Sequence, residues 1–115
     1  MELVYLAAPY THEKPSVVES RMSRLCVVDA ALMKQGVMTA SPLLKHFLLQ
    51  HSDLPGDWNY WKDYAEVLLS KCDKMIVVTM LGWDDSVGVQ AEIKLCERFG
   101  IPVEYIDPFT LEIWR

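Results

Sequence analysis

The alternation of short apolar runs with longer amphipathic segments is the feature that most constrains the fold of this chain. Four apolar runs have the length of buried strands: residues 3–8, 37–41, 74–80 and 101–106. Three segments with apolar residues at helical spacing separate them: residues 15–36, 58–72 and 86–99. Strands that alternate with helices form parallel sheets through right-handed crossovers. We therefore predict a three-layer α/β domain with a four- or five-stranded, mainly parallel sheet.

Turn-forming residues lie between these segments, and no repeat, low-complexity tract or linker divides the chain. Pro15 suits the first turn of a helix, whereas Gly36 and Gly100 suit helix ends. Pro42 opens a weak helical turn, residues 51–59 read as a loop, and Pro108 ends the pattern. We expect residues 1–115 to form a single domain similar to flavodoxin-like and Rossmann-like folds.

Charge and cysteine usage exclude several classes of function. The 16 acidic and 11 basic residues give a net charge of -5 without a run of like charges, which argues against a nucleic-acid polymer or a membrane as partner. No long apolar segment is present, so we expect a cytoplasmic protein. Cys26, Cys72 and Cys96 fit neither a disulfide framework nor a metal site, and we expect each thiol to be buried. His46 and His51 lack a third ligand, so no metal or cofactor is predicted.

Ligands of such folds bind at the carboxyl ends of the strands, which directs attention to residues 8–14, 41–46 and 81–88. The first of these loops, with Pro9 and Tyr10, lacks the glycines of a dinucleotide-binding turn or a P-loop. The third contains Ser86 and Gly88 at the start of a helix, where free amides can hold a phosphate or another anion. A plain helix cap by Asp85 or Ser86 explains the same residues and is the commoner case.

Glu92 is the candidate for chemistry on this helix. It lies one turn after Gly88, on a stripe beside the apolar stripe of Val89, Ile93 and Cys96 that should face the sheet. A carboxylate there would point toward the strand ends, below the space left by the missing Gly88 side chain. An exposed glutamate paired with a cation fits the periodicity equally well.

Other residues give weaker signals. Asp73 precedes a strand and is more often a cap or a strand-end hydrogen-bonding group than a catalyst. Arg21 could reach a ligand, but an acidic partner is favoured. Four aromatic residues could stack a base, although such spacing is more typical of a core or an interface: Trp58, Tyr60, Trp61 and Tyr64.

Three segments together resemble the nucleoside 2-deoxyribosyltransferase-like superfamily: Tyr5-Leu6-Ala7-Ala8-Pro9-Tyr10, Cys72-Asp73 and Ser86-Val87-Gly88-Val89-Gln90-Ala91-Glu92-Ile93. The pattern Ser-x-Gly-x-x-x-Glu is similar to the nucleoside 5′-monophosphate N-glycosidase branch, since the true transferases carry Asp where this chain has Ser86. Residues 54–58 and 82–86 also resemble a small bacterial and phage subfamily of the same fold.

The resemblance implies a nucleotide or nucleoside as the small-molecule substrate. Glu92 would attack the anomeric carbon, expel the base and form a glycosyl-enzyme ester that water then hydrolyses. Tyr5 would position the nucleophile or the sugar, and Ser86 would help to bind a 5′-phosphate together with the amides around Gly88. Four further residues are expected at the substrate: Pro9, Tyr10, Arg21 and Asp73.

One departure from the family pattern concerns the acid that assists the leaving base. The family places an acidic residue eight positions before the strand-end Asp, and this chain has Ala65 there. Asp63 could take the role if the helix were shifted. If it does not, the chain is a non-catalytic nucleotide-binding or sensor domain on the same fold. A third hypothesis is a structural module with Glu92 on its surface.

The resemblance also implies a homodimer or homotetramer, because family members complete their sites with residues of a neighbouring subunit. The apolar segment around Leu44, Phe47 and Leu48 would suit such an interface.

Overall fold

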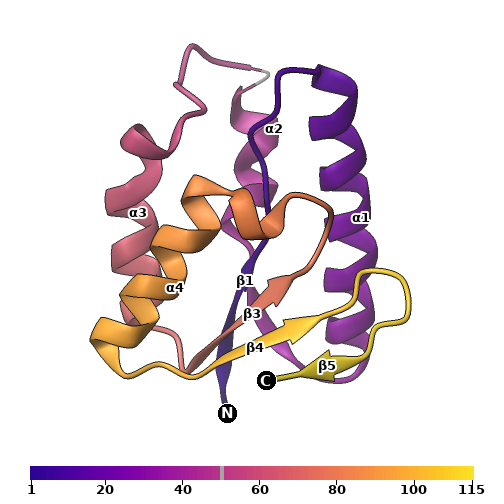
Figure 1. Cartoon of the computed structure of the whole chain (residues 1–115), viewed down its shortest axis with the longest axis vertical. Coiled ribbons are helices and arrows are strands. Elements are labelled where there is room, and N and C mark those ends of the chain that lie inside the picture. Colours follow the sequence, from indigo (N-terminus) through magenta and orange to yellow (C-terminus); the bar gives the residue numbers. More distant parts are fainter. Residues whose placement is uncertain (50) are drawn as a thin grey trace.

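The computed structural model describes residues 1–49 and 51–115. Within these residues five strands form one sheet in the order β2-β1-β3-β4-β5 (Figure 1). Their bounds are β1 (Leu3–Ala7), β2 (Met38–Ala40), β3 (Lys74–Val78), β4 (Val103–Ile106) and β5 (Ile113–Trp114). Strands β2, β1, β3 and β4 are mutually parallel, and β5 pairs antiparallel with β4.

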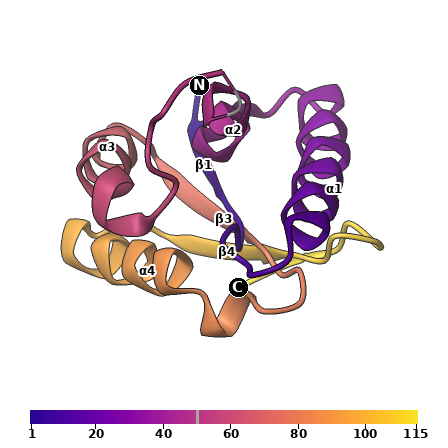
Figure 2. The same cartoon turned by 90° about the horizontal axis from the view of Figure 1, so that it is seen from above.

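Helices cover both faces of the sheet, which confirms the predicted three-layer α/β fold. They are α1 (Pro15–Lys34), α2 (His46–Leu49), α3 (Trp58–Ser70) and α4 (Val87–Phe99), with the 3-10 turns η1 (Pro42–Lys45) and η2 (Trp83–Asp85). Helix α1 lies on one side of the sheet, and α3 and α4 lie together on the other (Figure 2). None of the helices in the described part of the chain is long and apolar enough to cross a membrane.

Alternation along the two central strands divides the core into two halves. Val4 and Leu6 of β1 pack with buried residues of α1, whereas Tyr5 and Ala7 pack in the cluster that contains α3 and α4. Successive side chains of a strand point to opposite faces, so a strand buried on both sides is apolar throughout. This alternation places the Tyr5 side chain on the α4 face of the sheet.

The C-terminal hairpin was not predicted. After β4 the chain turns at Asp107, whose side chain accepts hydrogen bonds from the backbone of Phe109 and Thr110 at 2.8 Å. It then returns as β5, in which Ile113 pairs with Ile106. The sequence gives no sign of this strand because two residues carry no periodicity.

The prediction that the Cys26 thiol is buried is wrong. Cys26 is exposed on α1, while Cys72 and Cys96 are buried as predicted.

Candidate functional site

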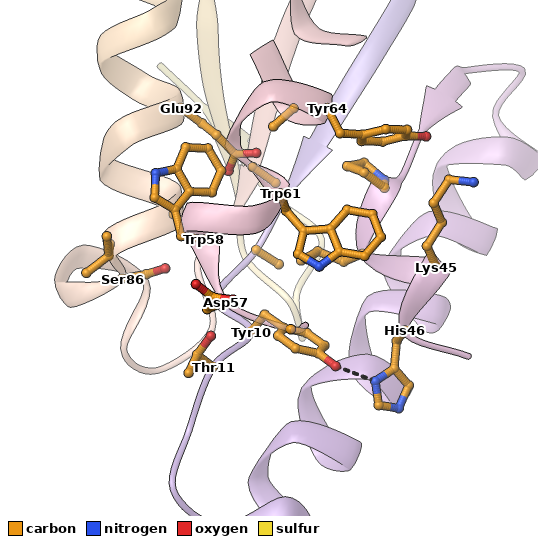
Figure 3. A pocket seen from close by; sticks show the side chains of 18 of the residues that line it. Tyr10, Thr11, Lys45, His46, Asp57, Trp58, Trp61, Tyr64, Ser86 and Glu92 are labelled. Atoms are coloured by element: carbon orange, nitrogen blue, oxygen red, sulfur yellow. Dashed lines mark hydrogen bonds between the residues drawn. The ribbon is translucent and has the colours of Figure 1, made fainter. Parts of the chain in front are cut away.

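A cavity of about 490 Å³ opens at the carboxyl ends of β1 and β3 (Figure 3). Its walls come from β1 and the loop that follows it, η1, α2, the start of α3, and the first turns of α4. Small-molecule sites in proteins occupy about 300 to 1,000 Å³, so the cavity can hold a compact organic ligand. Its position agrees with the edge of the sheet that the sequence indicated.

Glu92 lies in this cavity and is only 8% exposed. The Tyr5 hydroxyl donates a hydrogen bond to its carboxylate. On α4, Glu92 shares the buried side with Val89, about one turn before it, and with Cys96, about one turn after it. The alternative of an exposed glutamate is therefore wrong, and so is the hypothesis of a structural module with Glu92 on its surface.

Burial changes the ionisation of both partners. Burial raises the pKa of Glu92 from 4.5 to about 7, against the opposing effect of the Tyr5 hydrogen bond. Burial, followed by the negative charge of Glu92, raises the pKa of the Tyr5 phenol. Tyr5 therefore stays protonated as a donor, and Glu92 can exchange a proton near neutral pH. A carboxylate with these properties in a cleft is typical of a catalytic group.

Ser86 caps α4, because its side-chain oxygen accepts a hydrogen bond from the Val89 amide at 3.3 Å. The predicted cap by Ser86 is thus confirmed, and Ser86 and Gly88 also line the cavity, so the cap leaves the predicted role at a ligand open. A Cβ atom on Gly88 would lie 3.5 Å from Cε3 of Trp58. This distance is an ordinary van der Waals contact, so the Trp58 ring packs against the helix without requiring a glycine at this position.

Charges in the cavity are divided between two sides. Asp57 and Asp85 line it together with Ser86, whereas Lys45 and His46 belong to η1 and α2. Figure 3 shows Glu92, Ser86 and Asp57 on one side of the view and Lys45 and His46 on the other. Carboxylates beside Ser86 favour hydroxyl groups of a ligand as partners and oppose a dianion there.

Three aromatic side chains line the cavity: Trp58, Trp61 and Tyr64. The Trp61 ring is fixed by a hydrogen bond of 2.6 Å from its Nε1 to the Pro55 carbonyl. Tyr60, the fourth member of the predicted cluster, is exposed and is not among the described lining residues. Planar apolar walls of this kind suit a flat heteroaromatic ring.

Tyr10 lies in the cavity as predicted, but its partner was missed. Its hydroxyl is 2.6 Å from Nδ1 of His46, and Nε2 of His46 is 3.0 Å from a carboxylate oxygen of Glu19. The sequence analysis considers His46 only as a metal ligand and excludes that role, although His46 lies in one of the loops expected at the ligand. Its pairing with Glu19 depends on how α2 packs against α1, which no local signal reveals.

Several predicted site residues lie elsewhere. Asp63 is exposed and Pro9 is buried, and neither is among the described residues that line the cavity. Ala65 does line it, and a residue two positions away on a helix points to a different side. Position 65 therefore brings no carboxylate into the cavity, and the Asp63 carboxylate lies outside the described lining.

Asp73 and Arg21 are structural groups. Asp73 precedes β3 at the amino end of the sheet, and its carboxylate accepts a hydrogen bond of 2.7 Å from the Leu3 amide. Arg21 donates to the carbonyls of Tyr10, Thr11 and Leu81, so it contacts neither the cavity nor an acidic side chain in the described structure. Burial lowers the pKa of its guanidinium.

The described residues place no group of three or more His, Cys, Asp or Glu side chains where they could hold a metal ion. Residues 2–108 match the model of a family described as a domain of unknown function (DUF1937). A search of curated proteins found no match to the chain.

Proposed function

This chain belongs to the DUF1937 family, a domain of unknown function, and we propose that it breaks the N-glycosidic bond of a nucleoside or nucleoside 5′-monophosphate. The observation that carries the proposal is Glu92, a buried carboxylate in an aromatic-walled cavity with a tyrosine hydroxyl on it. The likeness of the Ser86 to Glu92 segment to the nucleoside 2-deoxyribosyltransferase-like superfamily supports the same assignment.

The proposed reaction has two steps, and Glu92 acts in both. In the first, its ionised carboxylate bonds to the anomeric carbon while the bond from that carbon to the base nitrogen breaks. The departing base keeps the electron pair and takes up a proton. In the second, water attacks the same carbon, the ester bond breaks, and the sugar leaves with a new hydroxyl while Glu92 is regenerated. If a second base takes the place of water, the outcome is transfer.

The residues that line the cavity offer contacts for both ends of a nucleoside or nucleotide. Trp58 and Trp61 offer flat surfaces for the base. The amides at the start of α4 and the Ser86 hydroxyl can donate to a 5′-phosphate, whereas the carboxylates of Asp57 and Asp85 oppose its negative charge and favour a free 5′-hydroxyl. The proposal therefore includes both the nucleoside and its monophosphate.

A non-catalytic nucleotide-binding domain is the second candidate, and Ala65 is the observation that favours it. This position lines the cavity without a carboxylate that could protonate the leaving base. Such a domain would be stabilised against heat by a nucleotide while free base never accumulated. Steady release of base excludes it.

The test is chromatographic detection of free base from ribo- and deoxyribonucleosides and their 5′-monophosphates. Glu92→Gln should abolish release, because the amide is a poor nucleophile. Glu97→Gln is the matched control, since it makes the same change on an exposed part of α4 and should leave release unchanged. Release that survives in Glu92→Gln would remove Glu92 from the nucleophile role.

We include a cytoplasmic location and a homodimer or homotetramer in the proposal, as the resemblance implies. Phe47 on α2 is 56% exposed and Leu48 is 46% exposed, which is the apolar surface that a subunit contact would cover. Sedimentation of the purified chain tests the assembly, and a monomer at all concentrations would contradict it.

A further inference from the structure

A polar chain of three residues reaches the cavity from the wall opposite Glu92. Tyr10 follows β1, His46 begins α2, and Glu19 lies on α1. The Tyr10 hydroxyl is 2.6 Å from Nδ1 of His46, and Nε2 of the same ring is 3.0 Å from Oε1 of Glu19. Tyr10 and His46 line the cavity (Figure 3). The His46 side chain is 8% exposed, and the Glu19 side chain is 58% exposed.

This geometry couples the protonation of His46 to the direction of the Tyr10 hydroxyl. In the neutral ring, Nε2 donates to Glu19 and Nδ1 accepts the Tyr10 proton. In the charged ring both nitrogens donate, so the Tyr10 oxygen becomes an acceptor and its proton is free to point at a ligand. The Glu19 carboxylate lies 3.0 Å from Nε2 and can accept its hydrogen bond in either protonation state of the ring. The Phe47 ring also packs against the His46 ring, at 5.5 Å between ring centroids, whereas the ammonium of the preceding residue, Lys45, lies over the Tyr64 ring.

The proposed reaction needs such a donor. A base that leaves as an anion is a poor leaving group, and a positioned acid supplies the proton that it takes up. Glu92 is committed as the nucleophile, Asp63 is exposed, and Ala65 has no acidic group. Asp57 and Asp85 also line the cavity, but they lie with Ser86 and are assigned to the 5′ group of the sugar. Tyr10 lines the cavity and has a proton source behind it.

We propose that Tyr10, backed by His46 and Glu19, donates the proton to the departing base, an assignment that rests on the proposed function. The Tyr10 proton moves to the base nitrogen as the glycosidic bond breaks, and the Nδ1 proton of His46 moves to the Tyr10 oxygen. His46 is then neutral and still donates from Nε2 to Glu19. The proton released when water attacks the glycosyl ester restores the charged ring. Tyr10 is the catalytic residue. His46 and Glu19 are positioning residues that orient the Tyr10 hydroxyl and replace the proton that it gives away.

The test compares two leaving groups on the same sugar. One substrate is the nucleoside or nucleotide that releases base most rapidly, and the other is the p-nitrophenyl glycoside of its sugar, whose leaving group departs without a proton. For Tyr10→Phe we expect kcat on the natural substrate to fall by about 100-fold or more, as loss of a general acid does, and kcat on the p-nitrophenyl glycoside to stay within about threefold. Tyr60→Phe is the control, because Tyr60 is exposed and outside the cavity.

Two further variants test the residues behind Tyr10. His46→Gln should behave as Tyr10→Phe does, with kcat reduced on the natural substrate and nearly unchanged on the p-nitrophenyl glycoside. Glu19→Gln changes an exposed side chain, so folding is spared, and it should lower kcat on the natural substrate alone by about 10-fold. Thermal melting of each variant confirms that it is folded.

The outcomes separate this assignment from the proposed function. An equal fall on both substrates, or no fall in Tyr10→Phe, overturns the assignment and leaves the glycosidase in place. Loss of activity on both substrates is the result for Glu92→Gln only. If the wild type releases neither leaving group, the proposed function fails and the proton donor fails with it.

Discussion

At the scale of single residues, Glu92 makes the folded protein less stable as the pH rises. Its pKa is about 7 in the fold and 4.5 in an unfolded reference, so the native state binds more protons between these values. The free energy of unfolding therefore falls with pH across this window, by about 3 kcal/mol in all. Glutamine has no such titration and can still accept the Tyr5 hydrogen bond. We expect Glu92→Gln to gain about 2 kcal/mol more stability over the wild type at pH 8 than at pH 5.

Urea unfolding at the two pH values measures this difference, with Glu97→Gln as the control for other titrating groups. A gain of equal size at pH 5 and pH 8 would mean that Glu92 keeps an ordinary pKa in the fold.

Tyr5 affects the same titration in the opposite direction. Its hydrogen bond stabilises the ionised carboxylate, so removing it should raise the pKa of Glu92 above about 7. If Glu92 is the nucleophile, as proposed, it must be ionised, so we expect Tyr5→Phe to move the acid limb of kcat/KM to higher pH, with most of the activity recovered under alkaline conditions. A pH profile of base release measures the shift. An unmoved limb with a lower plateau would place Tyr5 on the sugar instead.

At the scale of elements, Arg21 of α1 connects the loop after β1 with the loop after β3. Its guanidinium donates to Tyr10 and Thr11 on one side and to Leu81 on the other, at 3.0 to 3.3 Å. Gly82, which follows Leu81, has a φ of +94°, and a Cβ atom there would lie 2.7 Å from Nη2 of Arg21. The glycine thus permits both the turn and the contact that holds the cavity wall.

Gly82→Ala should therefore cost more than the same change at Gly36. Both positions have positive φ, which by itself costs about 1 kcal/mol for alanine, but nothing lies within 4 Å of a Cβ atom at Gly36. At Gly82 the guanidinium must also move away from the Leu81 carbonyl. We expect the loss of unfolding free energy to be about 1 kcal/mol larger for Gly82→Ala, measured by denaturant titration. Equal losses would show that the Arg21 guanidinium can move away from the alanine without lowering the free energy of unfolding.

The elements of the fold could be predicted from sequence because their signals are local. The apolar run from Met75 to Val78 and the Pro15 and Gly36 boundaries depend on neighbours in the chain. The hairpin that forms β5 was missed, since its strand has two residues and its turn depends on the Asp107 side chain.

Only the part of the site that belongs to a sequence motif could be predicted. Periodicity left Glu92 equally compatible with an exposed side chain, and the resemblance supplied the roles of Glu92 and Tyr5. The bond between them joins residues 87 positions apart, and the contact of His46 with Glu19 depends on α2 and α1 packing together. Arg21 looked like a ligand-binding cation because sequence does not reveal which backbone carbonyls need a donor.

At the scale of the whole molecule, the order of the strands explains where the cavity lies. The chain leaves β1 through α1 on one face of the sheet and leaves β3 through α4 on the other (Figure 2). Adjacent parallel strands whose connections diverge in this way leave a crevice at their carboxyl ends. Tyr10 follows β1 and Ser86 follows β3. The topology therefore brings the proposed proton donor and the helix that carries the proposed nucleophile to the same cavity.

A ligand in this crevice contacts segments from both outer layers, so its binding should stabilise the whole domain. The proposed function predicts that Glu92→Gln binds the nucleoside or nucleotide without cleaving it, so that the bound ligand persists long enough to measure. At a concentration of about 100 times Kd it adds about 2.7 kcal/mol, which corresponds to a rise in Tm of roughly 10 °C for a domain of this size. We expect this shift in a thermal melt with the compound that the wild type cleaves, and a smaller shift with its free base or its free sugar, because each fills only part of the cavity. If the free base alone raised Tm as much as the whole compound, the sugar would add nothing to the binding free energy. Glu92 would then lie too far from the anomeric carbon to attack it.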